Sequence, residues 1–134
     1  QDAMEDAGLT FDDRLYGLSN YDFESAYHAM NSLLARRADF TALFAMSDVI
    51  ALGAIRALAS AGLRVPEDVS VIGYDDTALA AASLPQITSV THPKDIMGED
   101  AADCLLQMLR GEIVQPRQHL YQPKLIERQS VVRL

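Results

Sequence analysis

A short apolar segment that runs directly into two carboxylates constrains this chain more than any other feature. Val69-Ser70-Val71-Ile72 leads straight into Gly73-Tyr74-Asp75-Asp76. An apolar run bounded by turn residues is typical of a strand buried on both faces of a parallel sheet. In open α/β sheets, ligands bind outside the carboxyl ends of the strands. Asp75 and Asp76 therefore belong either to a ligand or metal site, or to a turn that caps the next segment.

The rest of the chain alternates between predicted strands and predicted helices. The expected strands cover residues 14–18, 41–46, 69–74, 87–91 and 119–126. The expected helices cover residues 1–7, 23–37, 49–61 and 93–110, with one or two helical turns in 77–83. This alternation predicts an α/β fold, with a mostly parallel sheet and helices on both faces.

The loops that follow the predicted strands carry most of the polar side chains that could form a site. Parallel strands place these loops at one edge of the sheet, and they contain Asn20, Tyr21, Asp22, Ser47, Asp48, Asp75 and Asp76. An aromatic ring can stack on the apolar face of a sugar, and carboxylates can accept hydrogen bonds from pairs of hydroxyls. The sequence therefore predicts a site for a polyhydroxylated small molecule.

Charge and composition exclude several classes of protein. The formal net charge is −8, and the 134 residues contain no basic stripe. An acidic chain of this kind lacks the electrostatic footprint of a nucleic-acid-binding domain. No run of 18 apolar residues is present, so no membrane span is predicted. Cys104 is the only cysteine, which excludes an internal disulfide and a cysteine-based metal cluster.

Other chemistries find less support in the residue pattern. His28, His92 and His119 are scattered, so a zinc site is not expected, and no metal or cofactor is assigned. Asp48 together with Asp75 and Asp76 leaves a Mg²⁺ phospho-acceptor site as a less favoured alternative. The chain has neither a glycine-rich phosphate loop nor a G-x-S-x-G turn, and no catalytic residue can be named.

One long stretch, together with two shorter ones, resembles a known family. The stretches are FTALFAMSDVIALGAIRALASAGLRVPEDVSVIGYDDTALAAASLPQITSVTHPKDIMGEDAADCLLQMLRG, SNYDFESAYHAMNSLL and PKLIERQSV. They closely resemble the effector-binding domain of LacI/GalR transcriptional regulators, and the resemblance covers nearly the whole chain from about Ala3. It implies a periplasmic-binding-protein-like type I fold, mainly its carboxyl-terminal lobe. Residues 1–86 and about 118–134 would form that lobe, and residues from about 87 to 117 would belong to the amino-terminal lobe.

The resemblance also implies roles for individual residues. Asp75 matches the aspartate that binds polar groups of the effector, and Tyr21 matches the aromatic residue that stacks on it, with Asn20 beside it. Ser47 stands where the family often has asparagine, and His92 stands where many members have glutamine at the mouth of the cleft. Asp48 and Asp76 are expected to support the helix cap and the turn.

The resemblance further implies association and function. Family members dimerise through the helix matching residues 49–61 and the segment matching 77–85, so Ile50, Ala54, Ala57, Leu79 and Leu84 are the expected interface residues. Operator DNA would be bound only through an amino-terminal domain outside this sequence. We therefore expect a cytoplasmic, homodimeric, non-enzymatic sensor of a sugar or a nucleoside-like effector, without a membrane partner, whose two lobes close on the effector and alter DNA binding. The alternatives are a periplasmic sugar-binding protein of a transporter and, less favoured, an enzyme.

Overall fold

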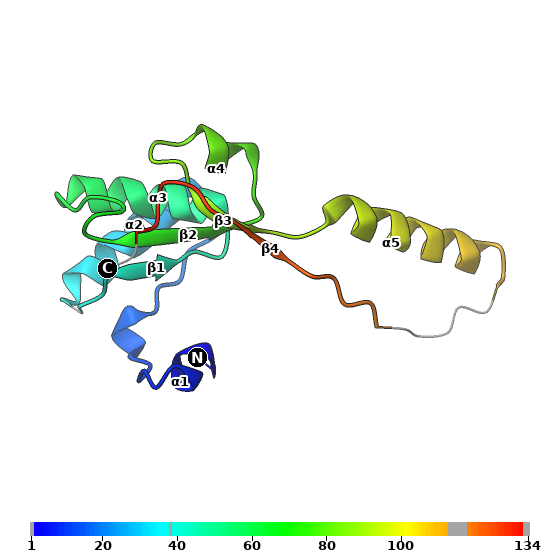
Figure 1. Ribbon diagram of the computed structural model, residues 1–134, viewed down its shortest axis with the longest axis horizontal. Coiled ribbons are helices and arrows are strands. Elements are labelled where there is room, and N and C mark those ends of the chain that lie inside the picture. Colours follow the sequence, from blue (N-terminus) through cyan, green and yellow to red (C-terminus); the bar gives the residue numbers. More distant parts are fainter. Residues whose placement is uncertain (1, 38, 113–117, 133–134) are drawn as a thin grey trace.

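The computed structural model describes residues 2–37, 39–112 and 118–132, and it contains one four-stranded sheet of order β1-β2-β3-β4. The strands are β1 (Ala42–Phe44), β2 (Ser70–Tyr74), β3 (Thr88–Thr91) and β4 (Lys124–Ile126). β1, β2 and β3 are parallel, whereas β4 runs antiparallel to β3 (Figure 1). The predicted fold class, an α/β fold with a mostly parallel sheet, is confirmed.

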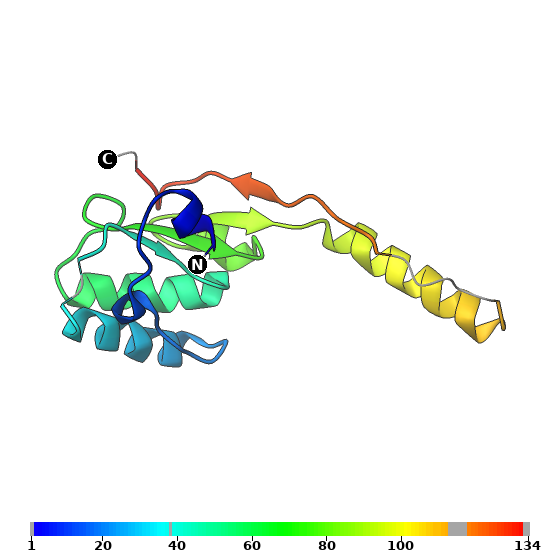
Figure 2. The same ribbon diagram turned by 90° about the horizontal axis from the view of Figure 1, so that it is seen from below.

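Two helices cover one face of this sheet, as Figure 2 shows. They are α2 (Phe23–Ala35) and α3 (Asp48–Ser60). Each begins at a capping side chain: Asp22 accepts the N–H of Ser25 at 2.8 Å, and Ser47 accepts the N–H of Ile50 at 3.3 Å. The helices approach each other closely at Gly53, where an added Cβ would lie 2.5 Å from the carbonyl oxygen of Phe23.

The hydrophobic core lies between these helices and the sheet. It contains Met30, Leu33, Ala45, Ala51, Ala54, Ile55, Ala57, Leu58, Val69, Val71, Ala80 and Ile87. Leu58 and Val71 are fully buried, and Ala80 brings the short helix α4 (Ala78–Ala82) into the same core. On the opposite face of the sheet, Met4, Leu9 and Phe11 from α1 (Asp2–Asp6) and the segment after it line one side of an open apolar cavity of about 600 Å³.

The helix α5 (Lys94–Leu109) stands apart from the rest of the molecule (Figures 1 and 2). The sequence predicts this helix correctly, but none of its residues is buried. Its apolar residues include Ile96, Met97, Ala101, Leu105, Met108 and Leu109, and the described residues leave them exposed. β3, by contrast, is hydrogen-bonded to β2 within the main sheet. The division into lobes stays a prediction, with α5 as the element that stands outside the main body.

The strand expected at residues 14–18 is wrong. The chain instead forms a 3-10 turn, η1 (Asp13–Leu15), in which the Asp12 side chain accepts the N–H of Arg14 at 2.8 Å. The carbonyl oxygen of Tyr16 accepts a hydrogen bond from Arg36 at 2.7 Å rather than from a neighbouring strand. An apolar cavity of about 470 Å³, lined by both Gly17 and Phe44, separates this segment from β1. Without an adjacent strand, the segment has no ladder of hydrogen bonds to join.

The remaining elements agree with the sequence expectation, although several are shorter. β4 has three residues where residues 119–126 were expected, and it begins directly after Pro123, which cannot donate to a ladder. Gly62 has a φ of 80° directly after the C-cap residue of α3, Ala61, as expected for a residue that ends a helix. Within the described part of the chain, no helix is long and apolar enough to cross a membrane.

Candidate ligand-binding site

A turn with unusual backbone geometry follows β2 at the carboxyl edge of the sheet. Asp75 has a φ of 96° and Asp76 a φ of 48°, so two consecutive residues other than glycine have positive φ. Such conformations cost roughly 1–3 kcal/mol each and persist only where the surroundings enforce them. The N–H of Asp75 donates to the carbonyl oxygen of Val90 at 2.9 Å, and the N–H of Asp76 donates to Ser89 Oγ at 3.1 Å. β3 therefore holds the backbone of the turn.

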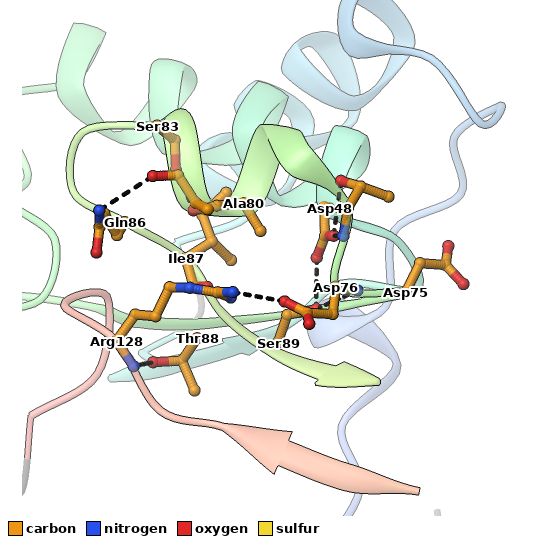
Figure 3. A network of polar contacts seen from close by, with 12 residues as sticks. Asp48, Asp75, Asp76, Ala80, Ser83, Gln86, Ile87, Thr88, Ser89 and Arg128 are labelled. Carbon is orange, nitrogen blue, oxygen red and sulfur yellow. Dashed lines mark hydrogen bonds and ion pairs between the residues drawn. The ribbon is translucent and has the colours of Figure 1, made fainter. Parts of the chain in front are cut away.

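Asp48 lies beneath this turn and is fully buried. Its Oδ2 accepts the N–H and the hydroxyl of Thr77, at 2.6 and 2.9 Å, and its Oδ1 accepts the hydroxyl of Ser89 at 2.6 Å (Figure 3). Gly73 leaves the space for it, because a Cβ there would lie 2.4 Å from Asp48 Oδ1. The carboxylate of Asp48 thus has its oxygens engaged inside the protein, where it satisfies buried donors.

Asp76 also points into the protein, toward Arg128. Asp76 Oδ1 accepts a charge-assisted hydrogen bond from Nη2 of Arg128 at 2.6 Å (Figure 3). Nη1 of the same arginine donates to the carbonyl oxygen of Ile87 at 2.9 Å. Sequence reasoning did not single out Arg128, because it lies 52 residues from Asp76.

Asp75 is oriented differently from its neighbour. In Figure 3 its carboxylate points away from the network that holds Asp48, Asp76 and Arg128, and the residue is partly exposed. Its carbonyl oxygen accepts a hydrogen bond from Nζ of Lys94, at the start of α5, another residue that sequence reasoning missed. The backbone of Asp75 is therefore fixed from two sides, while its carboxylate is directed outward.

His92 borders the same edge, directly after β3. Its ring stacks on Tyr74, with centroids 5.6 Å apart and an angle of 27° between the planes. Its Nδ1 is buried and has no hydrogen-bond partner among the described residues. A cavity of about 340 Å³ lies between His92, Asp76 and Lys94. This arrangement places an imidazole with an unmet polar atom beside the Asp75-Asp76 turn.

The residues around Tyr21 form a second group. Tyr21 is 71% exposed and lines the cavity of about 470 Å³ together with Met46 and Ile50. Ser47 is buried, and its hydroxyl caps α3. The side chain of Asn20 is exposed, and its carbonyl oxygen accepts the hydroxyl of Ser25 at 3.1 Å. No hydrogen bond joins this group to Asp75 within the described residues.

Asp22, in the same loop, is a helix cap and has a lowered pKa. The hydrogen bond from the Ser25 N–H to its carboxylate is the main cause, and the hydroxyl of Ser25 adds to it. The ionised carboxylate at the start of α2 is thus favoured by local contacts, as expected for a cap.

The predicted dimer residues lie in two different environments. Ala54 and Ala57 are buried in the core, so the expectation that they lie on an outer face of α3 is wrong. The physical reason is that these small side chains allow α3 to pack closely against its neighbours. Ile50 is partly buried. Leu79 and Leu84, in contrast, are exposed, and Leu84 is 90% exposed.

Comparison with known proteins defines the family. Residues 1–131, which include the whole site, match the periplasmic binding protein-like domain. The chain belongs to this family. Its relatives are LacI-family transcriptional regulators, so the resemblance noted in the sequence is confirmed.

Two sequence relatives illustrate the match. The regulator CelR of Thermobifida fusca is 38% identical over 130 residues, which cover 97% of this chain and 38% of CelR. The repressor PurR of Salmonella paratyphi B is 39% identical over 129 residues, covering 96% of this chain and 38% of PurR. The chain therefore spans less than half the length of these LacI-family relatives.

Solved structures of the same family agree with this fold. The complex of CelR with cellobiose has a TM-score of 0.91 and 38% identity, covering 96% of this chain and 39% of that one. The Escherichia coli repressor ascG has a TM-score of 0.86 and 35% identity, covering 98% and 47% of the two chains. The periplasmic-binding-protein-like arrangement is thus established by both sequence and structure.

Proposed function

We propose that this chain is the effector-binding part of a LacI-type transcriptional regulator, and that Asp75 binds a sugar effector. The observation that carries the proposal is the outward-facing carboxylate of Asp75 on a turn held by β3 and Lys94. Such a fixed acceptor at the carboxyl end of a parallel strand is the common position of a ligand site. The CelR complex with cellobiose, a relative of 38% identity, supports the choice of a sugar over a nucleoside-like effector.

The chemistry of the edge fits a polyhydroxylated molecule. An ionised carboxylate can accept hydrogen bonds from two hydroxyls, and each charge-assisted bond contributes roughly 1.5–3 kcal/mol. Tyr21 presents an exposed ring that can cover an apolar sugar face, and His92 adds an imidazole beside the turn. Asn20 and Ser47 are secondary candidates, because Ser47 is already used as a cap. These groups support binding, and we infer no catalytic step.

The uncovered apolar face of α5 supports the proposed division into two lobes. Leu105 and Leu109 are exposed on this helix, and such a face is normally buried against another element. We propose that residues from about 87 to 117 carry α5 to an amino-terminal lobe in a longer protein. Effector binding would then close the lobes and alter DNA binding in a cytoplasmic homodimer.

Calorimetry with the full-length protein tests this function. The probes are cellobiose, other mono- and disaccharides, and a set of nucleosides. Asp75→Asn keeps a residue that tolerates positive φ but removes the charge, so we expect at least a tenfold loss of affinity, the lower end of one charge-assisted bond. Asp103→Asn, an exposed change on α5, is the matched control and should bind like wild type. Equal affinity of Asp75→Asn and wild type would overturn the assignment.

A further inference from the structure

We propose that Arg128 is a positioning residue of this site: it reaches from the segment after β4, holds Asp76, and thereby fixes the direction in which Asp75 presents its carboxylate. The proposal rests on the proposed function, because it concerns the same turn. It adds a residue from a distant part of the chain to a site otherwise built from the edge of the sheet.

The positive-φ conformation of the turn has to be stabilised by a contact to the Asp76 side chain. Asp75 and Asp76 both have positive φ, and a change in the backbone of one residue redirects the side chain of the other. Asp76 Oδ1 and Arg128 Nη2 are 2.6 Å apart, and the side chains are only 22% and 16% exposed. A pair so well covered is weakly screened by solvent, so it can resist rearrangement of the turn.

Arg128 is itself held firmly enough to act in this way. Its backbone N–H donates to Thr88 Oγ1 at 2.9 Å, and Nη1 donates to the carbonyl oxygen of Ile87 at 2.9 Å. Two residues later, the carbonyl oxygen of Ser130 accepts the N–H of Val71 at 2.7 Å. The guanidinium therefore spans from the start of β3 to the turn after β2 (Figure 3).

Arginine suits this position better than lysine. A guanidinium is planar and donates in two fixed directions, one toward Ile87 and one toward Asp76, whereas an ammonium is a point charge on a flexible stem. Arg128→Lys should consequently hold the Asp75-Asp76 turn in part, and Arg128→Gln should lose nearly all of this hold.

The chain offers a matched control at the other end of β2. Arg64 and Asp68 form an arginine–aspartate pair at 2.9 Å before the strand begins, with side chains 70% and 31% exposed. Arg64→Gln breaks a pair of the same chemistry without touching the turn after the strand.

Hydrogen exchange on the full-length protein separates positioning from general stability. The reporters are the amides of Asp75, Asp76 and Thr77, and the reference is the amide of Ala45, which donates to the carbonyl oxygen of Ile72 at 2.8 Å. We expect Arg128→Gln to accelerate exchange of the three turn amides at least tenfold more than that of Ala45. Arg64→Gln should leave this ratio unchanged.

Binding of the probe sugar by the same variants completes the test. Arg128→Gln should lower affinity at least tenfold, Arg128→Lys should recover part of it, and the Asp76→Asn/Arg128→Gln double variant should lose no more than the worse single one. Should Arg128→Gln fail to fold, Arg128→Lys provides the same comparison with wild type.

Three outcomes would overturn the proposal. Equal acceleration of the turn amides and Ala45 would mean that Arg128 acts on global stability. Local acceleration with unchanged affinity would mean that the turn does not control binding. Additive losses in the double variant would mean that Arg128 acts separately from Asp76. If the wild-type protein binds no probe, the proposed function fails, and the exchange ratio alone decides whether Arg128 holds the turn.

Discussion

Ser89 Oγ donates a 2.6 Å hydrogen bond to Asp48 Oδ1, which joins β3 to the first residue of α3. Both residues are fully buried, and the same hydroxyl oxygen accepts the N–H of Asp76 at 3.1 Å. One serine therefore connects a helix, a strand and the Asp75-Asp76 turn. Because buried polar networks are costly when incomplete, loss of one member should affect all three elements.

Asp48→Asn should destabilise the protein by about 1–3 kcal/mol, because an amide nitrogen would face a donor and the charge-assisted bonds would be lost. The measurement is the free energy of unfolding in urea. Asp95→Asn is the matched control: it lies in the first turn of α5, is exposed, and should change stability by less than about 0.5 kcal/mol. Equal small effects would show that the network does not contribute to stability.

Gly73→Ala and Gly98→Ala should have opposite effects. An added Cβ at Gly73 would lie 2.4 Å from Asp48 Oδ1 and 3.1 Å from a methyl carbon of Ile87, and we expect a loss of about 1–3 kcal/mol. At Gly98, inside α5, nothing lies within 4 Å of an added Cβ, so the better helix former should gain about 0.5–1 kcal/mol. Thermal unfolding with helicity measured by circular dichroism reports both. A stabilised Gly73→Ala protein would contradict the packing described for Asp48.

Asp68 should give stability a defined acid dependence. Its hydrogen bonds with the Arg64 side chain, the closest at 2.9 Å, lower the pKa of Asp68 from 3.8 to about 2. A carboxyl group whose pKa is lower in the folded state contributes stability above its unfolded pKa and loses it as pH falls through the folded value. The difference in unfolding free energy between wild type and Asp68→Asn should be constant above about pH 5, fall as the pH drops through about 2, and be lost near pH 1. A difference that does not decrease between about pH 5 and pH 1 would exclude this ion pair as its source.

The proposed dimer should depend on the exposed leucines of α4 and the segment after it. Leu84 is 90% exposed, and Leu79 lies nearby on α4. Leu84→Glu should yield monomers, because a charge in an apolar contact is left unpaired. Leu18→Glu changes a leucine that is 79% exposed in a different segment and should keep the mass measured by light scattering. A dimer in both variants would place the interface elsewhere.

Local signals were sufficient for the elements that the sequence predicts correctly. Asp22 and Ser47 cap their helices by bonds to residues only three positions away, so the signal lies within a few letters. The apolar run before Gly73 correctly predicts β2, because a strand that is buried on both faces consists mainly of apolar residues. The periodicity of α5 likewise predicted a helix, although it could not show what covers it.

The errors and omissions concern contacts between distant parts of the chain. Residues 14–18 have strand-like composition, but a strand also needs a neighbour. Ala54 and Ala57 are small enough for either a surface or a core, and only the approach of α2 and the sheet decides between them. Arg128 resembles any surface arginine until its partner, 52 residues earlier, is known. Its place in the family-like stretch PKLIERQSV was the one local signal available.

The late position of Ser130 has a consequence for how this molecule is made. Its hydroxyl donates to the carbonyl oxygen of Val71, 59 residues earlier, at 2.5 Å, and accepts the N–H of Thr88 at 2.8 Å. A nascent chain that has reached only α5 already holds β1, β2 and β3, yet the buried groups of Val71 and Thr88 still lack this partner. Such long-range closure is slow because the intervening chain must be ordered first. During synthesis on the ribosome, the Asp75-Asp76 turn should therefore become rigid only after residues 128–130 have emerged.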